Sequence, residues 1–143
     1  MIVVDANLLI YAYDTASLRY EKSRAWLEEA FSGTEQIGLP WQSVAAFLRV
    51  MTNPKLHGRQ YSLNEAAAIV EDWMAQSSVR ILTPTDEHWL QFRKMIFDGN
   101  ASGPLVSDAE LAALTVEYGG VLHTTDRDFA RFPGLRWINP LTA

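Results

Sequence analysis

The chain has 143 residues, of which 48% are hydrophobic. This is the size and composition of one domain with one buried core, so we expect a single domain over residues 1–143. It has no cysteine, which excludes disulfides, thiolate metal sites and cysteine nucleophiles. Its net charge of -5 argues against broad attraction to nucleic acid, which would need a local basic patch or bridging cations. No apolar run is long enough for a membrane helix, so we expect a cytoplasmic protein without a membrane partner.

Short apolar runs alternate with longer helical patterns along the chain, and this alternation predicts an α/β fold. The predicted strands cover residues 2–4, 36–39, 80–83, 121–123 and, more briefly, 135–138. The predicted helices cover residues 8–13, 19–31, 40–50 and 62–76, followed by one that Asp86 caps and one around Leu111 to Val116. Ser62 and Glu65 have the spacing of a capping box. Together these elements predict one central parallel sheet of four or five strands flanked by helices.

Acidic side chains follow two of the predicted strands. Asp5 comes after the first strand and Asp126 after the fourth. The carboxyl ends of parallel strands share one edge of the sheet, and ligands bind in the crevice beside it. Asp128 lies two residues after Asp126, and Asp108 lies at the start of a helix that should run back along the sheet. We therefore expect these four carboxylates to converge.

Carboxylates that share a low-dielectric cleft repel one another, so such a cluster favours a bound cation. Oxygen ligands, with no cysteine and no histidine at ligand spacing, favour Mg²⁺ or Mn²⁺ over Zn²⁺. Such an ion can activate a water and neutralise charge that develops on a phosphodiester. Thr124, Thr125 and Asn7 could hydrogen-bond the carboxylates and fix their orientation.

Each acidic residue also has a plain structural interpretation. Asp108 taken alone fits a helix N-cap, and Asp126 or Asp128 taken alone fits a turn. The joint pattern favours a functional site. His57, His88 and His123 have no ligand-spaced partner and are interpreted as solvated or core residues, and the tryptophans as core or interface residues.

Two basic clusters stand out in an acidic chain. One contains Arg19, Lys22 and Arg24, and the other contains Lys55, His57 and Arg59. Either cluster could meet RNA phosphates, although solvated surface charge is the more common role for each residue.

Three segments together resemble a known family. Ile2-Val-Val-Asp5-Ala-Asn7, Val106-Ser-Asp108-Ala and Thr124-Thr-Asp126-Arg-Asp128-Phe129 are similar to the acidic signature of PIN-domain ribonucleases, specifically VapC-type toxins of bacterial toxin-antitoxin pairs. Further segments resemble one VapC subgroup, so the likeness spans nearly the whole chain: Leu39-Pro-Trp41, Phe47-Leu-Arg49, Thr52-Asn-Pro54 and Asp128 to Gly134.

The resemblance implies a Mg²⁺- or Mn²⁺-dependent endoribonuclease that cuts structured RNA, such as tRNA or rRNA, and arrests growth. It also implies a homodimer that a VapB-like antitoxin holds inactive in a toxin-antitoxin hetero-oligomer. Asp5, Asp108 and Asp126 correspond to the catalytic and metal-binding carboxylates, Asp128 to a more variable additional acid, and Thr124 to the residue that orients the first aspartate.

One position departs from the family pattern. The family carries a glutamate just before the Phe-Leu-Arg segment, and here Ala46 stands in that catalytic position. Alanine can neither bind a metal nor orient a water, and Gln42, one helical turn earlier, is a poor substitute. Ala46 is either natural or a deliberate Glu→Ala change that makes a toxic enzyme producible. The intact surroundings favour the second explanation, and the chain is expected to be folded, to bind metal weakly and to cleave RNA poorly or not at all.

Two other functional classes are compatible with parts of the pattern. An aspartate-nucleophile phosphotransferase also uses an aspartate after the first strand, but it would carry a second acid where this chain has Asn7. A catalytically inactive module that binds RNA or an antitoxin would follow from Ala46.

Overall fold

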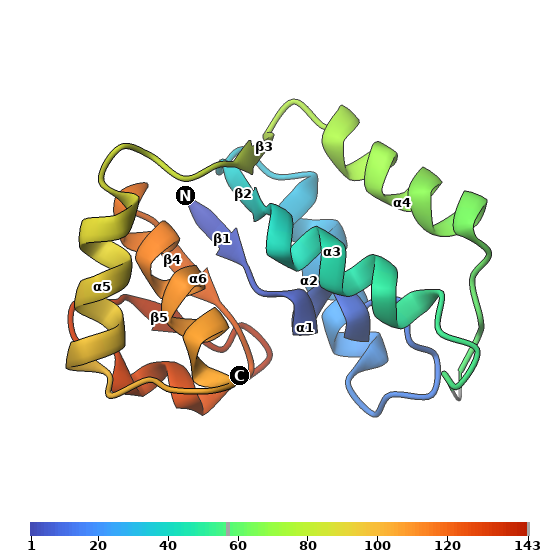
Figure 1. Cartoon of the computed structure of the whole chain (residues 1–143). Coiled ribbons are helices and arrows are strands. Elements are labelled where there is room, and N and C mark those ends of the chain that lie inside the picture. Colours follow the sequence, from blue (N-terminus) through green and yellow to red (C-terminus); the bar gives the residue numbers. More distant parts are fainter. Residues whose placement is uncertain (57, 143) are drawn as a thin grey trace.

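The computed structural model describes residues 1–56 and 58–142, so His57 lies outside the described residues. Within them the strands form one five-stranded parallel sheet in the order β3-β2-β1-β4-β5 (Figure 1). The strands are Ile2–Val4 (β1), Ile37–Pro40 (β2), Val79–Leu82 (β3), Val121–His123 (β4) and Trp137–Ile138 (β5). This confirms the predicted α/β fold.

Helices connect the strands and cover the sheet. They are Ala6–Tyr11 (α1), Tyr20–Phe31 (α2), Trp41–Met51 (α3), Leu63–Ala75 (α4), His88–Asp98 (α5), Leu105–Glu117 (α6) and the short 3₁₀ helix Arg127–Arg131 (η1). In Figure 1, α5 and α6 lie at the β4–β5 end of the molecule and α4 lies at the opposite end. None of the described helices is long and apolar enough to cross a membrane.

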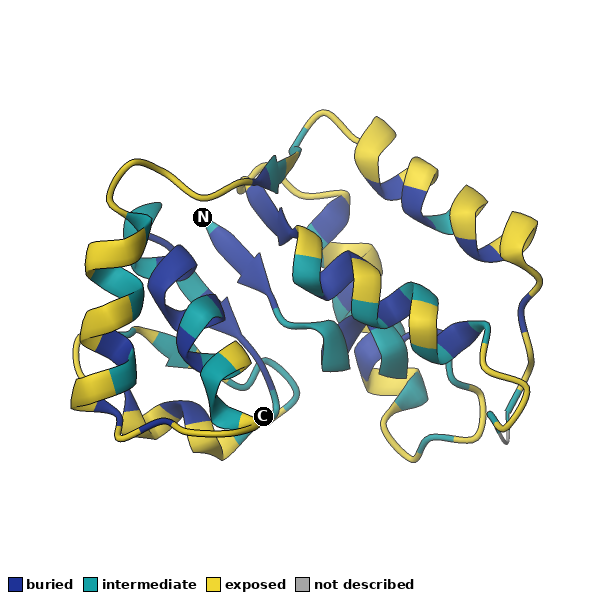
Figure 2. Cartoon of the chain, in the orientation of Figure 1, coloured by how far each residue is buried: buried dark blue, intermediate teal, exposed yellow. Residues whose placement is uncertain are grey.

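The central strand β1 is buried on both faces because successive side chains of a strand point to opposite sides of the sheet. Ile2 and Val4 join one core cluster with residues of α1, α2, α3 and α4. Val3 joins a second cluster with residues of α5, α6 and η1. Figure 2 shows the result, with buried strands in the middle and exposed surface on the outer sides of the helices. The helices therefore form a layer on each side of the sheet.

Helix starts show where sequence patterns succeed and fail. The capping box at α4 is confirmed, since the Ser62 hydroxyl accepts from the Glu65 amide at 3.1 Å and the Glu65 carboxylate accepts from the Ser62 amide at 3.0 Å. The prediction that Asp86 caps α5 is wrong. The cap residue is Glu87, whose side chain makes no capping bond, and its amide donates to the Thr85 hydroxyl. Thr85 therefore organises this turn in place of Asp86.

The aromatic residues only partly follow the core interpretation. Trp73 is buried, whereas Trp41 and Trp89 are exposed. His88 and His123 lie within the fold as partly buried or buried side chains. His88 is more than a packing residue, because its Nδ1 lies 2.7 Å from the Glu117 carboxylate and so ties the start of α5 to the end of α6.

Candidate active site

Asp5 lies where β1 meets α1 and is held from two sides. One carboxylate oxygen accepts from the Ala6 amide at 2.7 Å, which makes Asp5 the N-cap of α1. This cap explains why α1 begins at Ala6, two residues earlier than predicted. The other oxygen accepts from the Thr124 hydroxyl at 2.7 Å. Asp5 is thus tied to the residue that follows β4, the neighbouring strand.

The Thr124 hydroxyl links the strand ends together. It accepts from the Asn7 side-chain amide at 3.2 Å and from the Asp126 backbone amide at 3.0 Å while it donates to Asp5. Thr124 is fully buried. The hydroxyl therefore fixes Asp5, Asn7 and the backbone of Asp126 in one network at the carboxyl edge of the sheet.

Asp126 and Asp128 belong to the turn that follows. Asp126 is the N-cap of η1, and its carboxylate accepts from the Asp128 amide at 2.9 Å. The turn interpretation of Asp126 is therefore right as local structure. It does not compete with a role in a metal site, since a carboxylate has about four lone-pair directions and this bond uses one.

Asp108 lies in the first turn of α6, and its interpretation as an N-cap is wrong because Pro104 holds the cap position. Burial raises the pKa of Asp108 to about 6, with further upward contributions from the charges of Asp126, Asp5 and Asp128 and a downward one from Arg131. Charges act on one another in this way only over short distances. The charges of Asp5, Asp126 and Asp128 thus act on Asp108, although the four residues are far apart in the sequence.

The pKa of Asp5 is also raised. Burial raises its pKa, and the charge of Asp126 adds to that effect, while the bonds from Thr124 and Ala6 oppose it. A buried carboxylate with a like charge nearby favours a bound cation.

The donor chemistry fits a hard divalent cation. Besides the carboxylate oxygens, Asn7 offers Oδ1 as a further oxygen ligand. This atom is buried and has no hydrogen-bond partner among the described residues. In residues 1–56 and 58–142, however, no three His, Asp or Glu side chains are grouped closely enough to hold a metal as they stand. Metal binding would therefore require the carboxylates to move closer together around the ion. The charge of the ion would offset their mutual repulsion.

Ala46 lies in the middle of α3. One turn earlier on this helix, the Ser43 hydroxyl donates to the Val4 carbonyl at 2.7 Å, directly beside Asp5. Residues three apart share a helix face, so position 46 lies on the same face of α3 as Ser43, about 4.5 Å further along the helix. Gln42, one turn earlier on α3, donates its side-chain amide to the Ser107 carbonyl at 3.3 Å, next to Asp108 in the sequence.

Comparison with known proteins decides the family. The family model of the PIN domain matches residues 2–135. The chain is 38% identical over 140 residues to Ribonuclease VapC37 of Mycobacterium tuberculosis, a match that covers 98% of this chain and 97% of that protein. The chain belongs to the VapC ribonucleases of the PIN-domain family. These matches confirm the family resemblance that the acidic segments of the sequence indicated.

Solved structures share its fold. VapBC2 from Rickettsia felis, solved bound to a DNA fragment from its promoter, has a TM-score of 0.69 at 15% identity and covers 97% of this chain and 98% of that chain. Mycobacterium tuberculosis VapC20, named as a toxin that cleaves the sarcin-ricin loop, has a TM-score of 0.68 at 15% identity. The match covers 95% of this chain and 99% of that chain. At this identity the likeness establishes the fold of this VapC-family chain.

The sequence patterns missed two residues beside the site. Ser43 ties α3 to the end of β1, and Arg131 of η1 is the nearby positive charge that lowers the pKa of Asp108. For Ser43, the only sequence signal is a hydroxyl residue in the first turn of a helix that directly follows a strand, and this signal is weak. Arg131 lies in the segment from Asp128 to Gly134 that carries part of the family likeness, but nothing in its spacing indicates that it faces α6.

Proposed function

We propose that this VapC-family chain is the toxin of a toxin-antitoxin pair, a Mg²⁺- or Mn²⁺-dependent endoribonuclease whose activity Ala46 impairs. It hydrolyses phosphodiester bonds in structured RNA such as tRNA or rRNA. The single observation that carries this proposal is that the buried Thr124 hydroxyl donates to the Asp5 carboxylate and accepts from the Asp126 amide, which ties two acidic residues to one point at the carboxyl edge of the sheet.

Each residue of the site has one task in this mechanism. Asp5, Asp108 and Asp126 would hold the ion, with Asp128 as the additional metal-site carboxylate. When bound, the ion supplies an activated water and neutralises charge on the phosphodiester. Thr124 holds Asp5 in one orientation, and Asn7 holds Thr124. Ala46 leaves one side of the reacting water without a carboxylate to position it.

The proposed partners follow from the family. A VapB-like antitoxin keeps the toxin inactive in a hetero-oligomer, the toxin itself forms a homodimer, and the protein acts in the cytoplasm. The support for an antitoxin is that related structures of this fold are described as VapBC pairs.

The decisive experiment restores the missing carboxylate. The Ala46→Glu protein should cleave tRNA or rRNA in the presence of Mg²⁺ or Mn²⁺ at least about 100-fold faster than the Ala46 protein, since general acid-base groups typically contribute 100-fold or more. EDTA should stop the cleavage, and sequencing the new RNA ends would identify the cut site. Equal rates for the two proteins would disprove the proposed role of position 46.

The alternative is a catalytically inactive module that binds RNA or an antitoxin. Its support is the absence of a carboxylate at position 46 in an otherwise complete site. If both the Ala46 and the Ala46→Glu proteins retain RNA and neither cleaves it, the module is the correct interpretation.

A further inference from the structure

Two arginines from the separate basic clusters meet in one surface pocket. Arg24 of α2 and Arg59, which precedes α4, line a cavity of about 360 Å³. The rest of its lining consists of Tyr13, Tyr61, Glu65, Ala68 and Ile69. Residues 35 positions apart in the sequence thus present two guanidinium groups to the same space.

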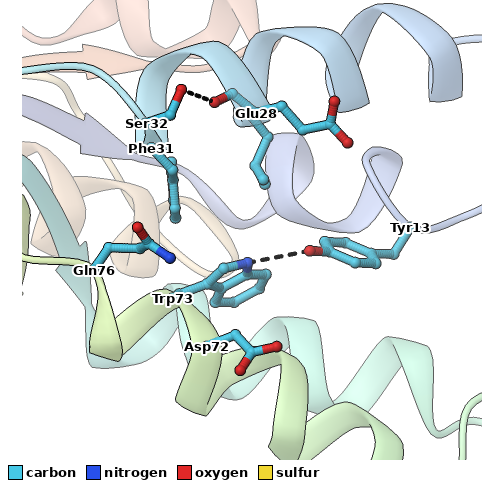
Figure 3. Close-up of a pocket in the computed structure, with 8 residues that line it drawn as sticks. Tyr13, Glu28, Phe31, Ser32, Asp72, Trp73 and Gln76 are labelled. Carbon is cyan, nitrogen blue, oxygen red and sulfur yellow. Dashed lines mark hydrogen bonds between the residues drawn. The ribbon is translucent and has the colours of Figure 1, made fainter.

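Tyrosine rings hold both guanidinium groups in place. The Arg24 guanidinium lies 4.5 Å from the centroid of the Tyr13 ring, and the Arg59 guanidinium lies 4.5 Å from that of Tyr61. Tyr13 is fixed in turn, because the Trp73 indole donates to its hydroxyl at 3.3 Å (Figure 3). The Tyr61 hydroxyl donates to the Tyr13 carbonyl at 3.3 Å. Stacked and supported arginines lose little freedom when they bind an anion.

Each arginine is already engaged by a glutamate at the surface. Arg24 Nε donates to Glu28 at 3.0 Å, and Arg59 Nη2 donates to Glu65 at 2.6 Å. A guanidinium has five N–H donors, so both arginines keep donors beyond these bonds. Both ion pairs are substantially exposed, and such pairs are worth little and exchange readily. The glutamates therefore act as weak competitors for an incoming anion.

The pocket lies within reach of the carboxylate site. Arg24 Nη1 donates to the carbonyl of Ala12, the C-cap of α1, while Asp5 caps the other end of the same helix. A six-residue helix rises about 9 Å, at ~1.5 Å per residue. That length corresponds to about three stacked nucleotides of a strand, at ~3.4 Å each.

We propose that Arg24 and Arg59 form a phosphate-binding subsite that holds the RNA strand beside the cleavage site, with Glu28 and Glu65 as carboxylates that the phosphate displaces. This inference rests on the proposed ribonuclease function and names how a chain of net charge -5 attracts its substrate. RNA is favoured over an acidic protein segment. An incoming carboxylate would only replace the carboxylates already present, whereas a phosphate offers oxygens to both guanidinium forks at once.

The test measures binding of a labelled single-stranded RNA to the Ala46 protein in EDTA, by fluorescence anisotropy over a range of salt concentrations. The double variant Arg24→Gln, Arg59→Gln should bind about tenfold more weakly or worse. Its log-log salt slope should fall by about 0.7 for each phosphate released. The matched control is Arg93→Gln on α5, since the Arg93 guanidinium likewise lies 4.5 Å from a ring, that of Phe97, at the other end of the molecule (Figure 1). This control should leave binding unchanged.

A second variant should change the affinity in the opposite direction. Glu65→Gln removes the competing charge from Arg59, and glutamine can still serve at this position of the capping box. RNA affinity should rise about threefold, since an exposed ion pair competes only weakly for Arg59. Misfolding would not produce a gain of this kind.

Two results would overturn the subsite. One is unchanged RNA affinity and salt slope in the double variant. The other is that binding of a polyglutamate probe depends on Arg24 and Arg59 while binding of the RNA does not. That result would assign the pocket to an acidic protein segment. Failure of the ribonuclease proposal is recognised separately, as absence of cleavage by the Ala46→Glu protein whatever its binding shows.

Discussion

On the strand side of the site, Asp5, Asn7 and Thr124 form a continuous hydrogen-bonded chain at the ends of β1 and β4. On the helix side, Asp108 meets only partial burial and neighbouring charge, and Ala46 brings no polar atom. The strand side is thus complete without a metal, whereas the helix side depends on an ion and on a carboxylate that this chain lacks. This difference suggests that the fold orients Asp5, while the chemistry is limited by what α3 and α6 bring to it.

The largest effect should come from the strand side. In the active Ala46→Glu protein, Asp5→Asn should reduce RNA cleavage at least about 100-fold, because it removes a proposed metal-binding charge. Asp98→Asn, on the exposed end of α5 where Asp98 pairs with Lys94, is the matched control and should retain the full rate. Cleavage assays at saturating Mn²⁺ check both, and a rate above a tenth of the parent rate for Asp5→Asn would break the assignment.

Thr124→Val should cost about 10- to 100-fold in metal affinity or activity, as loss of a residue that orients a ligand usually does. The change removes the bond to Asp5 and the acceptor for Asn7 and Asp126 while nearly keeping the side-chain shape. Thr125→Val is the neighbouring control, because among the described residues Thr125, unlike Thr124, makes no side-chain hydrogen bond to the carboxylates. A Mn²⁺ titration compares the two, and equal affinities would show that the hydroxyl network has no part in holding the ion.

On the helix side, the raised pKa of Asp108 should affect how the stability of the protein depends on pH. The folded protein raises the pKa of Asp108 from 3.8 to about 6. Its protonated form is therefore favoured on folding, and the contribution of Asp108 to the stability of the metal-free protein should fall as the pH rises from 3.8 through about 6. Asp108→Asn should then raise Tm by a few degrees at most at about pH 7.5 and leave it unchanged below about pH 4. Thermal unfolding in EDTA measures this, and a lower Tm for the variant near neutral pH would refute it.

Gln42→Ala should give the smallest effect. Its bond to the Ser107 carbonyl is long and partly exposed, so the free energy of unfolding should change by less than about 1 kcal/mol. Denaturant unfolding checks this expectation. A larger loss would mean that Gln42 fixes the start of α6, and with it Asp108, more firmly than the geometry indicates.

The two sides also differ in how far sequence could predict them. Asp5 and Asp126 follow strands, so the rule for the carboxyl edge of parallel sheets is enough to predict that they lie together. The bond from Thr124 to Asp5 joins residues 119 positions apart and was indicated by the family likeness and by hydroxyl chemistry. The helix caps at Asp5 and Glu87 depended on local backbone geometry that residue type alone does not determine.

Surface features were the least predictable. The meeting of Arg24 with Arg59 depends on how α2 and α4 pack against Tyr13, which no local pattern encodes. The same holds for His88 and Glu117, which come together only because α5 packs against α6. Side chains that follow strands inherit their position from the sheet, whereas those on outer helices depend on the packing of the whole chain.

Direct measurement of Mn²⁺ binding by electron paramagnetic resonance tests the shared ion most closely, because it needs neither an RNA nor an active enzyme. The Ala46 protein should bind Mn²⁺, and Asp5→Asn, Asp108→Asn and Asp126→Asn should each weaken binding about tenfold or more, while Asp98→Asn should not. If the three variants bind Mn²⁺ as the parent protein does, these aspartates do not share a divalent ion.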